Sequence, residues 1–196
     1  VSFDCGGTRY ERRAFISYPD NALVVRFSAS RKGQQNLRLA YSPNPVSTGR
    51  FTADGTDALC YTGALDNNGM RYAVRIKAIA EGGRVSVSGD RLCIDGADAV
   101  TFILTADTDY KPNYDPDFND PKAYVGVAPD ATTADWLRLA ARKGYKHLLR
   151  DHCKDYAALF GRVDFRIDGG TADTALPTAD RLAAYRKGAT DHALET

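Results

Sequence analysis

The chain has 196 residues, 43% hydrophobic and 26% charged, which is within the size of one domain and ordinary for a globular protein. Its 26 basic and 25 acidic side chains give a formal net charge of +1, which argues against a nucleic-acid or anionic-membrane surface because both need a basic excess. No apolar run approaches the roughly 20 residues of a membrane span, and the many β-branched and aromatic residues exclude a disordered chain.

Alternating apolar residues predict strands throughout the first half of the chain. The predicted strands are residues 9–18, 22–29, 35–41, 57–65, 70–80, 84–88, 91–95 and 99–106. Turn residues such as Asn67-Asn68-Gly69 and Gly82-Gly83 separate them by short connections, which favour antiparallel neighbours, so 57–106 is expected to form a meander. The fold predicted here is mainly β, an antiparallel β-sandwich.

The pattern changes after residue 106. Residues 107–129 contain four prolines and no periodicity, which predicts a long loop. A helix is expected from Thr132 to Lys143, with Asp130 or Thr132 as its N-cap and Gly144 as its stop. A second helix is expected over 145–160, with its apolar residues on one face, followed by a strand at 163–167 and a short helix over 177–187. Residues 1–128 are thus expected to form a β-sandwich domain, and 129–196 a helical linker.

The first residues predict that the chain is a piece of a longer protein. It begins with Val1 rather than Met, and residues 1–5 already alternate. The first residues contain no charged segment followed by an apolar one, so the sequence predicts no signal peptide.

Four cysteines, Cys5, Cys60, Cys93 and Cys153, show no Cys-x-x-Cys spacing, which disfavours a structural zinc site. Cys60 and Cys93 either pair, if their strands are neighbours, or serve as two small buried hydrophobic residues.

No catalytic motif is present in the sequence. It lacks a Gly-rich phosphate loop, a Gly-x-Ser-x-Gly elbow and a His-Glu-x-x-His motif. His147 and His152 are five residues apart on a predicted helix, so they project in different directions and cannot chelate one metal. His152 lies on the apolar face and is expected to be a packed side chain. The sequence predicts no catalytic residue, metal or cofactor.

The loop over 107–120 is acidic and aromatic, and three interpretations remain open. Its oxygen ligands are compatible with Ca²⁺, although it lacks the glycine and final glutamate of an EF-hand loop. Its tyrosines and carboxylates are compatible with contacts to sugar rings and hydroxyls. It is otherwise a solvated connector whose aromatic residues pack on a neighbouring surface. The candidate contact residues are Tyr110, Asn113, Tyr114 and Asp115.

Several segments match one known family in the right order. They are AFISYPDN at 14–21 with LVVR at 23–26, GMRY at 69–72 with EGG at 81–83, TADTDY at 105–110, HCKDYAALFGRV at 152–163 and PTADRL at 177–182. Together they resemble glycoside hydrolase family 95, the inverting α-L-fucosidases and their relatives. Residues 14–16 are looser than the family pattern, and 107–110 are more acidic.

The resemblance implies that the chain is the latter part of an N-terminal β super-sandwich, followed by the linker to an (α/α)₆ catalytic barrel. The catalytic residues of the family lie in that barrel, so none is carried over to this chain, which is expected to be inactive alone. The implied partners are the barrel and an oligosaccharide with terminal α-L-fucosyl or α-L-galactosyl residues, with no nucleic acid, membrane or cofactor. The parent is expected in the periplasm or secreted.

Two alternatives stay open beside this interpretation. One is a free-standing carbohydrate-binding β-sandwich, which has no need of the helical pair at 132–160. The other is a family 65-type phosphorylase or hydrolase, which shares the architecture.

Overall fold

The computed structural model describes residues 1–114, 119–120, 122–164 and 176–191 of the chain. The chain forms two units, Val1–Tyr156 and Ala157–Thr196, and each is described by itself. The first unit contains β1 (Ser2–Cys5), β2 (Thr8–Ser17), β3 (Ala22–Ala29), β4 (Gln35–Ala40), β5 (Ser47–Asp54), β6 (Ala58–Leu65), β7 (Arg71–Glu81), β8 (Arg84–Ser88), β9 (Arg91–Ala97), β10 (Ala99–Thr108) and α1 (Asp130–Lys143). It also contains most of α2 (Tyr145–Phe160), whereas α3 (Thr178–Tyr185) belongs to the second unit.

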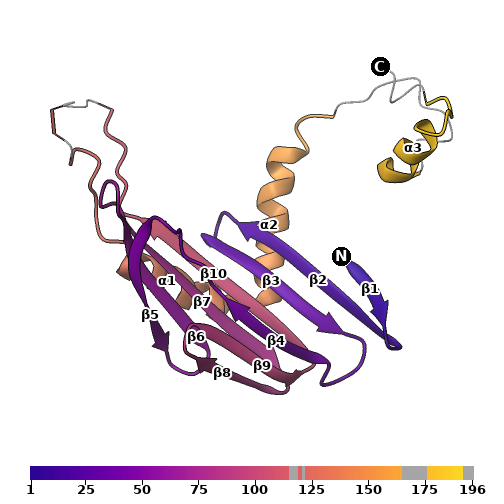
Figure 1. Ribbon diagram of the computed structural model, residues 1–196, viewed down its shortest axis with the longest axis horizontal. Coiled ribbons are helices and arrows are strands. Elements are labelled where there is room, and N and C mark those ends of the chain that lie inside the picture. Colours follow the sequence, from indigo (N-terminus) through magenta and orange to yellow (C-terminus); the bar gives the residue numbers. More distant parts are fainter. Residues whose placement is uncertain (115–118, 121, 165–175, 192–196) are drawn as a thin grey trace. The chain divides into compact units, whose positions relative to one another are not determined.

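Two antiparallel sheets confirm the predicted β-sandwich. The larger sheet has seven strands in the order β1-β2-β3-β10-β7-β6-β5, and the smaller has three in the order β4-β9-β8 (Figure 1). The main core lies between them, because alternate residues of each strand point to the same face. Its buried members include the large side chains of Leu59, Leu92, Ile94, Val100 and Phe102.

The predicted meander over 57–106 is wrong in one respect. The chain leaves the large sheet after β7, forms the β8–β9 hairpin in the small sheet and returns as β10, which pairs with β7. The change of sheet occurs at Gly82-Gly83, where both residues have positive φ. A Cβ at Gly83 would lie 2.5 Å from the Asp95 carbonyl oxygen, so only glycine fits there.

Two strands were not among those predicted. The short β1 pairs with β2 at one edge of the large sheet, and β5 pairs with β6 at the other edge. Strand β5 reads STGRFTAD, and only Ser47 and Phe51 in it are partly buried. Its apolar pattern is therefore too weak to predict a strand.

Helix α1 covers the opposite face of the large sheet. Its Leu137 and Ala140 are buried against Ile103 of β10. Thr105 of β10 donates a hydrogen bond of 2.9 Å from its hydroxyl to the carbonyl oxygen of Thr133. These contacts make α1 part of the first compact unit.

The two ends of α1 differ in how well they were predicted. The helix begins at Asp130, with Pro129 in the N-cap position and no side-chain cap, so the predicted Asp130 or Thr132 cap is wrong. Gly144 ends the helix with φ of 76°, as expected.

The first half of α2 continues this second layer. Leu148 is fully buried, and the His152 ring stacks on Phe15 of β2 at a centroid distance of 5.0 Å. His152 is thus the packed side chain that the apolar pattern predicted. Farther along the helix, Tyr156, Leu159 and Phe160 are exposed.

Lys143 joins the β2–β3 turn to both helices. Its Nζ lies 2.7 Å from Asp20 Oδ1 and 2.6 Å from Asp151 Oδ2. The Ser17 hydroxyl donates to the other oxygen of Asp20 at 2.5 Å. The SYPDN segment at 17–21 therefore forms a turn that fixes the end of α1 and the middle of α2.

In the second unit, Arg181 of α3 donates two hydrogen bonds, of 2.8 and 2.7 Å, to the carboxylate of Asp191. The predicted strand at 163–167 falls largely outside the described residues, and Val163 and Asp164 lie in no strand. The division expected after residue 128 concerns the longer polypeptide and stays a prediction.

Candidate functional site

Asp109 fixes the base of the loop that follows β10. Its side chain is only 2% exposed. One carboxylate oxygen accepts a hydrogen bond of 2.9 Å from the backbone N–H of Arg71, and the other accepts one of 2.8 Å from the Arg71 guanidinium. The loop therefore leaves the large sheet from a fixed, ion-paired position beside β7.

The returning segment of the loop pairs with its outgoing segment at one isolated bridge. Tyr110 and Val125 form an isolated antiparallel bridge, and the rings of Tyr110 and Tyr124 stack with centroids 6.3 Å apart. The Tyr124 hydroxyl donates to the carbonyl oxygen of Asn68, in the β6–β7 turn, at 2.7 Å. The base of the loop is thus a small built structure and not a free connector.

The predicted contact residues differ in their location and exposure. Tyr110 lies in the base and is 57% exposed as a residue, and Tyr114 is 94% exposed farther along the loop. Asn113 is also exposed, whereas Asp115 lies outside the described residues. The sequence did not single out Tyr124, although its aromatic partner Tyr110 was a candidate.

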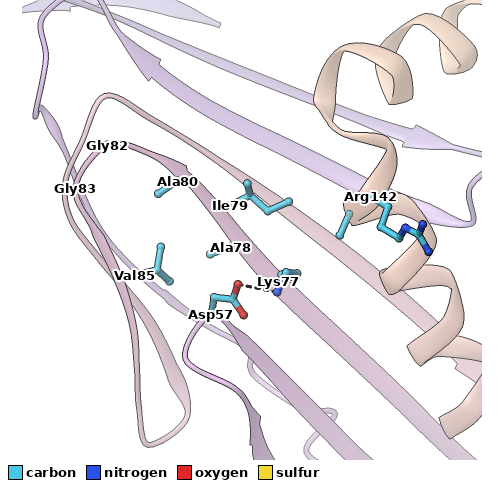
Figure 2. Close-up of a pocket in the computed structure, with 10 residues that line it drawn as sticks. Asp57, Lys77, Ala78, Ile79, Ala80, Gly82, Gly83, Val85 and Arg142 are labelled. Atoms are coloured by element: carbon cyan, nitrogen blue, oxygen red, sulfur yellow. Dashed lines mark hydrogen bonds and ion pairs between the residues drawn. The ribbon is translucent and has the colours of Figure 1, made fainter.

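Another pocket, of about 580 Å³, lies in a groove between β7 and the C-terminal end of α1. Figure 2 shows Asp57 and Lys77 joined across its floor, with a Nζ–Oδ2 distance of 2.6 Å, and Arg142 on the helix side. The rest of the lining consists of apolar residues and glycines, which offer few polar side-chain groups: Ala78, Ile79, Ala80, Gly82, Gly83, Val85 and Ala141. Because the Asp57 carboxylate is neutralised by Lys77, the groove has no group prepared for proton transfer.

Two other carboxylates differ from a general acid in the direction of their pKa shift. A hydrogen bond from Arg26 lowers the pKa of Glu81. Hydrogen bonds from Arg150 and Lys143 lower the pKa of Asp151 to about 2. A glycosidase acid needs a raised pKa, so both residues are suited to ion pairs and not to catalysis.

The described residues contain no group of three or more His, Cys, Asp or Glu side chains that could hold a metal ion. Cys60 and Cys93 are both buried and both free, as two small hydrophobic residues would be. Within the described part of the chain, no helix is long and apolar enough to cross a bilayer.

Two curated relatives match nearly the whole chain. It is 27% identical over 201 residues to the probable α-fucosidase A of Aspergillus niger, a match that spans 93% of this chain and 24% of the relative. It is 23% identical over 212 residues to α-L-fucosidase 2 of Arabidopsis thaliana, with 95% and 25% covered. The chain therefore spans about a quarter of the length of these relatives.

A solved structure supports the fold. A putative kojibiose phosphorylase from the human microbiome superposes with a TM-score of 0.50, over 78% of this chain and 21% of its own, at 7% identity. At that identity the likeness concerns the fold alone.

Two family models divide the chain between them. The glycosyl hydrolase family 95 catalytic domain model matches residues 144–196, which include α2 and α3. The model of the glycosyl hydrolase family 65 N-terminal domain matches residues 1–113, more than half of the chain and all ten strands. The chain therefore belongs to the glycosyl hydrolase family 65 N-terminal domain family, and the resemblance to glycoside hydrolase family 95 is confirmed by the second model and by the two fucosidase relatives.

Proposed function

We propose that this chain is the non-catalytic β-sandwich and linker part of an inverting glycoside hydrolase that removes terminal α-L-fucosyl or α-L-galactosyl residues from oligosaccharides. The observation that carries the proposal is the alignment of 93% and 95% of the chain with two α-fucosidases four times its length. The chain supplies a scaffold, and the catalytic groups lie in an (α/α)₆ barrel of the same polypeptide.

The described geometry supports a scaffold role. Asp57 is paired with Lys77, and the pKa shifts of Glu81 and Asp151 are downward. An inverting hydrolase needs a protonated acid and a base about 6.5–9.5 Å apart with room for a water, and these ion-paired carboxylates do not provide that arrangement.

The loop after β10 is the part of the scaffold that we assign to the substrate or the barrel. Tyr110 is held at its base, and Asn113 and Tyr114 are exposed beyond it. Together with Asp115 they are proposed to contact the barrel or the outer sugars of an oligosaccharide. The parent is proposed to act in the periplasm or outside the cell.

One experiment tests both the activity and its location. The 196-residue chain and the complete reading frame that encodes it are each incubated with an aryl α-L-fucoside, and release of the aryl alcohol is followed together with the anomer of the sugar by NMR. We expect turnover from the complete product alone, with β-L-fucose formed first. Turnover by the repurified 196-residue chain would refute the scaffold role. A complete reading frame without a barrel that still binds glycans would favour a free-standing carbohydrate-binding module.

A phosphorylase is the second candidate, favoured by the family 65 model over residues 1–113. A phosphorylase transfers the sugar to inorganic phosphate, whereas a hydrolase transfers it to water. Sugar phosphate formed only when phosphate is added would replace the hydrolase proposal, and release of free sugar at the same rate without phosphate would support it.

A further inference from the structure

The small sheet crosses the large one obliquely. At its start β4 lies beside β3, since Gln35 and Phe27 line the same recess. Just past its end, the Tyr41 ring lies 5.6 Å from Tyr61 of β6 and 6.3 Å from Phe51 of β5, measured between ring centroids. Strand β4 therefore runs diagonally from β3 to the β5 edge of the large sheet, and β9 and β8 follow on one side of it.

The main core continues into exposed surface along one cross-strand row of the large sheet. The pairing registers place four apolar residues in this row, from β7 to β2: Ile76, Leu104, Leu23 and Ile16. They lie on the face of the small sheet, because Ile76 and Leu104 belong to the main core. Ile76 is buried, Leu104 and Leu23 are partly buried, and Ile16 is 71% exposed. Burial is therefore lost step by step towards β2.

A recess of about 490 Å³ lies on the same face, at the ends of β7 and β10. Its apolar lining includes Leu65, Met70, Val74 and Ala106. Ala106 is exposed, although it alternates with Leu104 on the core face of β10. Asn44, in the segment that follows β4, also lines the recess. The uncovered area therefore extends from Ile16 to this recess and is bordered by β4.

Strand β4 has a hydrogen-bonded neighbour on one side only. It pairs with β9 and is an edge strand of the small sheet among the described residues. Such an edge presents unpaired N–H and C=O groups, and proteins often protect it with proline or free charges. Strand β4 contains no proline, and its one charged side chain, Arg38, is paired with Asp95 at 2.8 Å. The register shift lies between Gln35 and Leu37, so the rest of β4 is regular and suited to pairing.

We propose that a further β-strand of the same polypeptide, from outside residues 1–196, pairs with the open edge of β4. Neighbouring strands lie about 4.8 Å apart, so a strand beside β4 covers the uncovered area. Its alternate apolar side chains contact Leu23, Ile16 and Ala106 and close the core at this end. The resemblance implies a larger sandwich without indicating which edge is extended, and the geometry assigns the extension to β4.

The length of the relatives identifies the source of this strand. Nearly the whole chain aligns with two proteins of which it spans about a quarter, so about three quarters of each relative lies outside the match. The inference rests on the proposed function in one respect, that the chain is part of a longer polypeptide. It needs no particular activity of that polypeptide.

The first test compares thiol labelling in the 196-residue chain and in the product of the complete reading frame. The Ile16→Cys variant of each is treated with a maleimide under native conditions, and peptide mass spectrometry separates its label from that on the exposed Cys5 and Cys153. We expect labelling at this position to be at least about a hundredfold slower in the complete product, because the added strand must open first. Asp90→Cys, in the exposed β8–β9 turn away from this area, is the control and should react at similar rates in both proteins.

The second test needs no substitution and distinguishes a strand from another kind of cover. Hydrogen exchange of the peptide that contains residues 35–41 is compared in the same two proteins. We expect slower exchange in the complete product, because the outward N–H groups of β4 gain hydrogen-bond partners there.

Three results would overturn the proposal. Equal labelling of Ile16→Cys in the two proteins would show that the face stays open. Slower labelling without slower exchange at 35–41 would show that a loop or a helix covers the face and that β4 remains an edge. Slower labelling of the 196-residue chain itself as its concentration rises would assign the face to a second copy. None of these results depends on turnover of a fucoside, so they are distinguishable from a failure of the proposed function.

Discussion

Asp109 is the residue on which the position of the loop after β10 depends. Both of its carboxylate oxygens accept hydrogen bonds from Arg71. Its backbone carbonyl oxygen accepts a hydrogen bond of 2.6 Å from the N–H of Gly126, on the returning segment of the loop. Its side chain therefore pairs with Arg71 of β7, and its backbone joins the two ends of the loop. We therefore assign this carboxylate a structural role, which is to hold the base of the loop in place.

We expect Asp109→Ala to lower the free energy of unfolding by about 1–3 kcal/mol, because the Arg71 N–H loses its partner in a part-buried position. Urea unfolding measures the loss, and hydrogen exchange at Lys111 and Gly126 should accelerate. Asp90→Ala, which removes an exposed partner of Arg91, is the control and should cost no more than about 0.5 kcal/mol. Equal costs for the two variants would show that Asp109 does not fix the loop.

Asp151 is expected to make the stability of the folded chain depend on pH. Hydrogen bonds from Arg150 and Lys143 lower its pKa to about 2 in the folded chain, against about 3.9 in the unfolded chain. The contribution of Asp151 to the free energy of unfolding is therefore present above about pH 4 and is lost as the pH falls towards 2. We expect the protection factors of the amides in the first half of α2 to fall over that interval, and Asp151→Asn to remove this part of the pH dependence. An unchanged profile in Asp151→Asn would contradict the assignment.

Among the elements, the turn between β7 and β8 determines which sheet the following strands join. Gly83 has φ of 64° and no room for a Cβ, whereas Gly89 has φ of 61° and open space around its Cα. Gly89→Ala should therefore cost about 1 kcal/mol for backbone strain alone, and Gly83→Ala several times as much because the β9 backbone must move. Chemical denaturation of both variants compares them directly. A similar cost at both positions would show that the close approach of Gly83 to the β9 backbone does not affect stability.

Helix α2 combines a docked half with an exposed half. Leu148 is fully buried, whereas Phe160 is 69% exposed. We expect Leu148→Ala to cost about 2–5 kcal/mol and Phe160→Ala less than about 0.5 kcal/mol in the 196-residue chain. Thermal unfolding followed by circular dichroism measures both. A large cost at Phe160 would mean that this ring packs on other residues of the chain in spite of its exposure.

The elements also show which features a single sequence reveals. The alternating strands β2, β3, β7 and β10 and the helix stop at Gly144 were predicted because each carries its own pattern. Strand β5 was missed because its formation depends on pairing with β6, where the Tyr61 ring covers Gly49. The exchange of partners at β7–β10 was missed because a period of two identifies a strand without identifying its neighbour.

The candidate site divides in the same way. Tyr110 and Tyr114 were found from composition, since they lie in a long acidic and aromatic segment without periodicity, and loops of that length are usually functional or disordered. Asp109 and Tyr124 were not singled out, because their importance lies in partners 38 and 56 residues away in the chain.

At the scale of the whole molecule, the chain presents one side for packing and another for the loop. The face of the large sheet away from the small one is covered by α1 and the first half of α2. The loop leaves from the end of β10, beside the β6–β7 turn that Tyr124 contacts. In the parent that we propose, this end is where an outer sugar of a long substrate would meet the scaffold.

The final prediction tests that placement in the product of the complete reading frame. Tyr114→Ala should raise KM for an oligosaccharide by about three- to tenfold and leave KM for an aryl fucoside unchanged, because only the longer substrate reaches the loop. Tyr110→Ala should have the same effect and should also accelerate hydrogen exchange at Lys111, since it removes the stack on Tyr124. Tyr18→Ala is the control for loss of an exposed ring elsewhere on the surface. An equal rise in KM for both substrates, or none for either, would assign the loop to structure alone, because a contact made only with the outer sugars cannot affect a substrate that lacks them.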